Sequence, residues 1–129
     1  LYAAEYASQH NWRDNPRRTR VRYHFLEGGV ALKGVEVKLG HETLGSDGTN
    51  AFQTPLATLH AFNGWADQFL ATPATGLRDT HLKAGATVAG VRLDAIVHRF
   101  RADRGGARYG SEWDLQAVLQ YRNHYAVGI

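Results

Sequence analysis

The sequence predicts an all-β fold: an antiparallel up-and-down meander that forms part of a transmembrane β-barrel, with one long loop containing a short helix. Three observations support this prediction. Segments of about 9–12 residues, close to the ~9–11 that cross a bilayer as a tilted strand, alternate between apolar and polar side chains. Long and short connections alternate between these segments. The charged residues gather on one face of the strands.

The composition limits the classes to which the chain can belong. Its 129 residues are 43% hydrophobic, which is enough for one ordered domain. No apolar run reaches the ~18 residues that a transmembrane helix requires. Cysteine is absent, so disulfide scaffolds, cysteine–zinc sites and thiol catalysis are excluded. Because the sequence starts at Leu1 and stops within a strand-like pattern at Ile129, we expect residues 1–129 to be a single fragment of a longer barrel.

Three strands are predicted before the long loop, at about 1–9, 20–31 and 35–44. Their side chains alternate with the period of two that a half-buried strand requires. The alternation is clearest in the third strand, where Val35 and Val37 face away from Glu36 and Lys38.

Residues 45–79 interrupt the alternation and form the long loop. A connection this long inside a compact domain is typical of a functional loop. Within it, residues 64–70 (GWADQFL) place Trp65 and Phe69 four positions apart. This spacing predicts a short helix with both rings on one face.

Four more strands are predicted after the loop, at about 80–88, 91–102, 112–122 and 125–129. In the second of them, Arg92 and Asp94 face away from Leu93 and Ala95. The seven strands are joined by long connections at 10–19, 45–79 and 103–111, and by short turns at 32–34, 89–90 and 123–124. Short turns on one rim and long loops on the other are typical of outer-membrane barrels.

One face of the predicted sheet is charged and the other is apolar. Charges on neighbouring strands must face water, outside the protein or in a lumen, because a dry core would make them costly to bury. The charged face is predicted to carry Arg22, His24, Glu36, Lys38, Glu42, His81, Lys83, Arg92, Asp94, His98, Asp114, Gln116, Gln120 and Arg122. The apolar face is predicted to end in an interfacial girdle of Tyr2, Tyr6, Tyr23, Phe25, Trp113, Tyr121 and Tyr125.

A soluble sheet with one face on a core would show the same alternation. The alternative is therefore a soluble β-sheet domain that binds a ligand or partner, with residues 45–79 as its lid.

The long loop and its flanks resemble a segment of the alginate-export-like porins, outer-membrane proteins of Gram-negative bacteria. The resemblance lies in FQTPLATLHAFNGWADQFL (52–70) and TPATGLRD (72–79), and in the flanks YHFLEGG (23–29), HRF (98–100) and YGSEWDL (109–115). It covers most of the chain and corresponds to the C-terminal part of the barrel.

The resemblance implies a location in the bacterial outer membrane, contact with its lipid, and passive transport without a cofactor or catalysis. A homo-oligomer is compatible with it. The alginate pathway of this family is lined mainly by arginine, whereas the wall predicted here mixes both signs and favours a general porin for hydrated solutes or an anionic polysaccharide. The predicted anion-attracting residues are Arg22, Lys38, Lys83, Arg92 and Arg122, with Glu36, Asp94 and Asp114 as counter-charges.

The long loop is predicted to fold into the barrel and narrow it. Trp65 and Phe69 would pack inside, while Asp67 and Arg78 would face the path. Large apolar side chains in an extracellular loop need such a place of burial. The alternative is that the loop caps the rim or contacts a neighbouring subunit.

Other constellations predict no further chemistry. The seven histidines show no HxH or HExxH spacing, so no metal site is expected. No nucleophile motif of an enzyme occurs, and Asp94 and Asp114 are predicted to pair with Arg92 and Arg122. The arginines near the first loop are predicted to form a solvated rim without a nucleic-acid partner.

Overall fold

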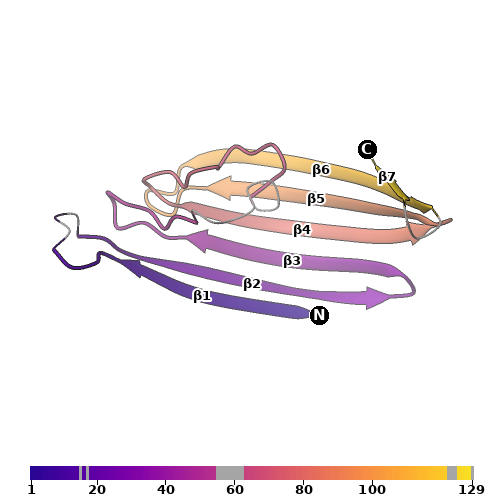
Figure 1. The fold of residues 1–129 in the computed structure, drawn as a ribbon, viewed down its shortest axis with the longest axis horizontal. Helices are drawn as coiled ribbons and strands as arrows, with labels where there is room; N and C mark the ends of the chain where they lie inside the picture. Colours follow the sequence, from indigo (N-terminus) through magenta and orange to yellow (C-terminus); the bar gives the residue numbers. More distant parts are fainter. Residues whose placement is uncertain (15, 17, 55–62, 122–124, 129) are drawn as a thin grey trace.

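The computed structural model describes residues 1–14, 16, 18–54, 63–121 and 125–128. These residues form one antiparallel sheet of seven strands in the sequential order β1 to β7 (Figure 1). The predicted meander is therefore confirmed, and the sheet remains open, with β1 and β7 at its edges. The described part of the chain contains no helix with the length and hydropathy needed to span a membrane.

The strands are β1 (Tyr2–His10), β2 (Arg20–Leu32), β3 (Val35–Leu44), β4 (Leu77–Val88), β5 (Val91–Arg101), β6 (Arg108–Tyr121) and β7 (Tyr125–Gly128). Two strands begin earlier than predicted. β4 starts at Leu77 because Leu77 and Arg78 already pair with the end of β3, and β6 starts at Arg108. The short helix predicted at 64–70 is wrong: this segment consists of turns, and Gly64 and Asp67 adopt positive φ angles of 89° and 53° that interrupt a right-handed helix.

The two ends of the sheet differ in their connections (Figure 1). At one end, the turn end, two-residue turns join β2 to β3 and β4 to β5. Lys33 and Ala89 have φ angles of 50° and 51°, and Gly34 and Gly90 each have 82°. Two successive positive φ angles are typical of the type I′ turn, whose twist matches that of the flanking strands. The long connections all lie at the opposite end, the loop end.

The strand pairing defines two faces. The loop-covered face is the one on which the loop between β3 and β4 lies; the other is the open face. Along β4, the loop-covered face carries Leu77, Asp79, His81, Lys83 and Gly85, and the open face carries Arg78, Thr80, Leu82, Ala84, Ala86 and Val88.

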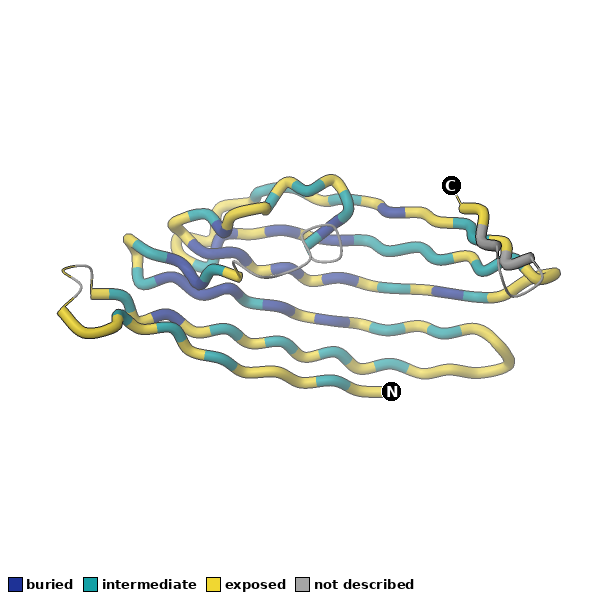
Figure 2. The backbone as a smooth tube through the Cα atoms, in the orientation of Figure 1, coloured by how far each residue is buried: buried dark blue, intermediate teal, exposed yellow. Residues whose placement is uncertain are grey.

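A hydrophobic core lies between the loop and the loop end of the strands. It consists of Val21, Leu44, Phe52, Leu77 and Phe100, and Leu77 is completely buried. The buried residues gather toward the loop end of the sheet (Figure 2). The loop supplies Phe52 to this core, so the loop and the strand ends fold as one unit.

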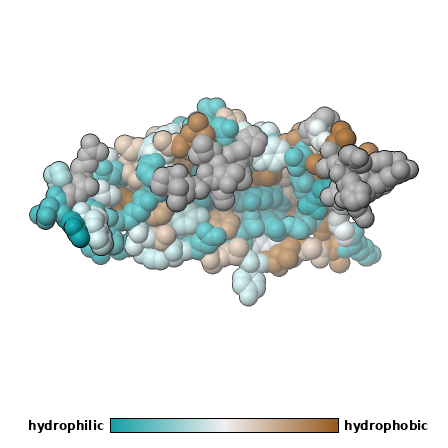
Figure 3. Space-filling view, in the orientation of Figure 1, coloured by the Kyte–Doolittle hydropathy of each residue, from teal (hydrophilic) through white to brown (hydrophobic). Residues whose placement is uncertain are grey.

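The turn half of the sheet has the opposite polarity. Its open face exposes large apolar side chains; Leu26 is 64% exposed, Trp113 73% and Leu115 71%. Its loop-covered face carries charged residues, and hydrophilic groups are visible beside the loop in the space-filling view (Figure 3). A soluble two-layer protein would bury the apolar face instead.

Candidate functional site

A buried carboxylate on β4 is the centre of the polar network on the loop-covered face. Asp79 is only 1% exposed. Its Oδ2 atom accepts hydrogen bonds from Nδ1 of His98 at 2.7 Å and from Nδ1 of His81 at 3.3 Å. Such partners are necessary because an unpaired buried carboxylate is very costly. Since a carboxylate only accepts, both Nδ1 atoms must carry hydrogen.

The network extends sideways from Asp79 across the sheet. Nε2 of His98 lies 3.5 Å from Oδ2 of Asp114 on β6, and Nε2 of His81 lies 3.5 Å from Oε2 of Glu27 on β2. These five residues therefore alternate acid and imidazole from β6 to β2, and we call them the acid–imidazole chain.

A glycine on β3 allows the chain to cross that strand. Gly40 is the register partner of His81. A Cβ atom at Gly40 would lie 2.1 Å from Nε2 of His81, closer than two atoms can approach. The His81 ring therefore occupies the space above β3 and reaches Glu27 on β2. Gly85 serves the ion pair of Arg92 and Asp94 in the same way, with an added Cβ only 2.2 Å from Nη2 of Arg92.

Asp79, His81 and His98 also form the ligand set that a divalent cation such as Zn²⁺ prefers. Their ligand atoms lie within 4.8 Å of one another. The sequence does not predict this group, because its histidines do not stand at HxH or HExxH spacing. The available signal was an acid and a histidine two residues apart, which share one face of a strand. Since these atoms already hydrogen bond one another, we assign no metal to them.

The loop is held down on this face by contacts to several strands. The Asn63 side chain donates to Glu42 on β3, and the backbone N–H of Ala66 donates to Oε1 of Glu112 on β6 at 2.7 Å. Phe69 packs on Phe100, with ring centroids 4.7 Å apart. Beneath this segment lies a cavity of about 120 Å³ whose lining includes Trp65 and the histidines of the acid–imidazole chain.

Most of the predicted pore-lining residues share the loop-covered face. They are Glu36, Lys38, Lys83, Arg92, Asp94 and Asp114. Lys38 pairs with Glu36 and Arg92 with Asp94, each at 2.6 Å. The predicted pairing of Asp94 with Arg92 is therefore present, while Asp114 contacts His98. Arg122 lies outside the described residues.

Arg22 is placed on the open face, which corrects the sequence prediction. The error arose because the apolar residues of β2 change face along the strand. Val21 and Tyr23 lie on the loop-covered face, where the loop covers them, whereas Leu26 lies on the open face. His24 and Phe25 were misassigned for the same reason, so Tyr23 and Phe25 do not belong to an outer aromatic girdle; the side chains of Tyr121 and Tyr125 lie outside the described set.

The residues predicted for a constricting loop divide into two groups. Trp65, Asp67 and Phe69 lie in the segment above the loop-covered face, where all three are half-buried. Arg78 does not belong to the loop. It lies in β4, projects from the open face, and pairs with Asp103 at 2.8 Å.

No protein-family model, curated protein or solved structure matches the chain. The resemblance to the alginate-export-like porins therefore stays a prediction.

Proposed function

We propose that the chain forms part of the wall of a β-barrel channel in a bacterial outer membrane. The loop-covered face would line a water-filled lumen and the open face would contact lipid. One observation carries this proposal: in the turn half of the sheet the apolar side chains lie outside and the charged side chains lie inside.

This polarity matches a membrane barrel better than a protein in water. Lipid removes the cost of exposing the apolar residues, and a hydrated lumen removes the cost of burying the charges. The apolar residues of the open face of β4 run from Leu82 to Val88, and six residue steps at ~3.4 Å make about 20 Å. This length is of the order of the ~25 Å apolar band of outer-membrane barrels.

The open edges of the sheet also support the membrane proposal. The outer edges of β1 and β7 have no partner strand among the described residues. Unpaired backbone groups are costly in hydrocarbon, so a membrane wall must be closed by further strands. These strands would complete the barrel around the loop, which would then act as the constriction.

The charge of the lining bears on the solute. The described strands place three Lys or Arg residues on the loop-covered face, namely Lys38, Lys83 and Arg92. They place eight carboxylates there: Glu5, Glu27, Glu36, Glu42, Asp79, Asp94, Glu112 and Asp114. Glu42, Asp79 and Asp114 are buried, so five carboxylates remain in the lining beside the three cationic groups, and an acidic lining attracts cations. It supports a channel for neutral or cationic hydrated solutes, and gives no support to an anionic polysaccharide.

The competing hypothesis is the soluble binding domain with a lid. The small cavity beneath the loop is the observation in its favour. Against it stands the row of exposed apolar residues on the open face, which a soluble domain would have to cover.

Site-directed labelling separates the two hypotheses. Because the chain has no cysteine, Leu93→Cys and Gln116→Cys each introduce a single thiol, on opposite faces at the same depth of the sheet. In lipid vesicles, a water-soluble maleimide should label Gln116→Cys and spare Leu93→Cys. Denaturant should make both reactive. A soluble domain exposes both positions, so equal labelling of the folded variants would refute the membrane proposal.

A further inference from the structure

The open face changes character at the loop end. Every Asp and Glu in the described strands β1 to β6 lies on the loop-covered face. The open face instead carries arginines close to the long loops. We call Arg20, Arg22, Arg78, Arg99 and Arg101 the cationic rim.

Within the described residues, Arg78 is the one arginine of the cationic rim that has a counter-charge. Arg78 stands directly opposite Arg101 in the register of β4 and β5, and like charges in this arrangement repel. Arg78 is compensated by Asp103, which accepts from its Nε at 2.9 Å. The guanidinium groups of Arg20, Arg22 and Arg101 make no hydrogen bond or ion pair within the described part of the chain.

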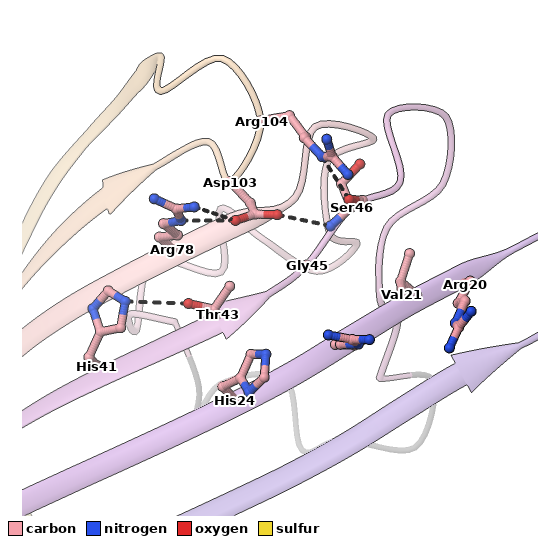
Figure 4. A pocket seen from close by; sticks show the side chains of 11 residues that line it. Arg20, Val21, His24, His41, Thr43, Gly45, Ser46, Arg78, Asp103 and Arg104 are labelled. Carbon is pink, nitrogen blue, oxygen red and sulfur yellow. Dashed lines mark hydrogen bonds and ion pairs between the residues drawn. The ribbon is translucent and has the colours of Figure 1, made fainter.

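A pocket of about 610 Å³ lies in the cationic rim, and Figure 4 shows its side chains. Arg78, Asp103 and Arg104 gather on one side, and Arg20 lies across from them. The lining contains four arginines (Arg20, Arg22, Arg78 and Arg104) and one carboxylate, Asp103. Asp103 is already occupied by Arg78 and by the backbone N–H of Ser46. Arg104 donates from its Nε to the backbone oxygen of Ser46. Among the described residues, the guanidinium groups of Arg20 and Arg22 therefore remain free to bind an anion.

The surroundings of the pocket select the kind of anion. His24 and His41 line its lower side, toward the middle of the strands, and the next open-face residues of β2 and β3 are Leu26 and Leu39. Cationic groups thus adjoin an exposed apolar surface, which complements an amphiphile with an anionic head. A free anion in solution would gain nothing from that surface.

We propose that this pocket binds the phosphate of a lipid headgroup, with the acyl chains lying along the apolar open face. Guanidinium groups suit this task because they bind phosphate oxygens in pairs. The inference rests on the proposed function, since it requires the open face to contact lipid. It goes further by giving the loop end a chemical preference for one class of lipid.

Binding of a defined phospholipid tests the inference. The full chain in neutral detergent micelles is mixed with phosphatidic acid, or with diacylglycerol of the same chain length, and bound lipid is counted by native mass spectrometry. The double variant Arg20→Gln, Arg22→Gln should bind phosphatidic acid about 10- to 30-fold more weakly, from about a factor of five for each arginine near an anionic surface. Diacylglycerol binding should not change.

A second double variant, Lys33→Gln with Arg92→Gln, removes the same charge away from the rim and should keep the affinity for phosphatidic acid. Equal losses in both variants, or equal binding of the two lipids by the unmodified chain, would overturn the inference. Inorganic phosphate serves as the competitor. If it binds as tightly as phosphatidic acid, the site recognises a free anion and the assignment to lipid is wrong.

The outcome can be separated from that of the channel proposal. The labelling of Leu93→Cys and Gln116→Cys reports membrane orientation and does not depend on Arg20 or Arg22. It also shows whether the rim variant has folded. Suppose that Leu93→Cys escapes the maleimide but that the unmodified chain binds phosphatidic acid no better than diacylglycerol. This result would refute the lipid site and leave the channel proposal standing.

Discussion

The loop half and the turn half of the same strands are built with opposite polarity. At the loop end, Val21, Leu44 and Phe100 lie inside against the loop, and arginines project from the open face. At the turn end, charged residues such as Lys83 and Asp94 lie inside, and leucine and valine cover the outside. The reversal occurs within single strands, most clearly in β2.

This difference shows that the polarity of each strand position depends on what covers it. The loop supplies Phe52 and Phe69, so the residues beneath it become apolar. Beyond the loop, no apolar side chain of the described residues covers that face, and the same row of positions becomes charged. The loop half therefore has a core of its own, whereas the apolar residues of the turn half need a partner surface outside the sheet.

The largest expected effect comes from removing the central carboxylate of the polar interior. Asp79→Ala should lower the free energy of unfolding by about 3–5 kcal/mol, because it leaves two buried imidazoles without their shared acceptor. Denaturant titration of the full chain in detergent measures this. Asp94→Ala is the matched control, since Asp94 pairs with Arg92, whose side chain is 42% exposed. If Asp79→Ala and Asp94→Ala lowered the free energy of unfolding equally, the acid–imidazole chain would contribute no more stability than a partly exposed ion pair.

A smaller effect is expected in the apolar interior. Phe69→Ala should cost about 1–3 kcal/mol, less than a fully buried Phe would, because the ring is only partly buried. It should also loosen the loop and raise single-channel conductance in a planar bilayer. Leu70→Ala, at a neighbouring side chain that is 57% exposed, should change neither quantity. Unaltered conductance in a destabilised Phe69→Ala channel would contradict the constriction.

The smallest effect is expected at Asp47, at the start of the loop between β3 and β4. Backbone N–H groups of Thr49 and Asn50 donate to Oδ1 of Asp47 at 3.0 and 2.8 Å, and these bonds lower the pKa of Asp47 from 3.8 to about 2. A lowered pKa in the folded state stabilises the protein above pH 3.8, and this contribution is lost as the pH falls through 2.

Stability measured between pH 5 and pH 2 should therefore contain a small component that Asp47→Asn abolishes. Asp14→Asn, at an exposed loop carboxylate, is the control and should retain that component. If the pH profile of Asp47→Asn matched that of the unmodified chain, the turn would not depend on the charge of Asp47.

The meander could be predicted from the sequence because its signals are local. A period of two gave the strands, and Lys33-Gly34 and Ala89-Gly90 gave the turns. The placement of Arg22 could not be predicted in this way. It depends on the loop covering Val21 and Tyr23, a contact between residues far apart in the sequence.

The centre of the site could be predicted only in part. His81 and His98 were recognised as inward-facing, but the pairing register that joins them to Asp79 is a property of the folded sheet. The spacing of Trp65 and Phe69 predicted a helix, and the positive φ angles that prevent it arise from docking of the segment. Arg78 falls in the predicted loop because the alternation in the sequence places the start of this strand at Thr80, whereas pairing with β3 begins at Leu77.

The type I′ turns give the proposed wall a direction. During insertion, one end of the sheet must pass through hydrocarbon, and the cost rises with the number of polar groups that it carries. The turns between β2 and β3 and between β4 and β5 carry two residues each, and Lys33 is the charged one among these four. The loop end carries the long loop and the arginines. In outer-membrane barrels the long loops face outward and the short turns face the periplasm, so the loop end would be the end that crosses the hydrocarbon. The two short hairpins thus mark the end that would stay on the periplasmic side, and the cost of insertion would fall on the polar loop end.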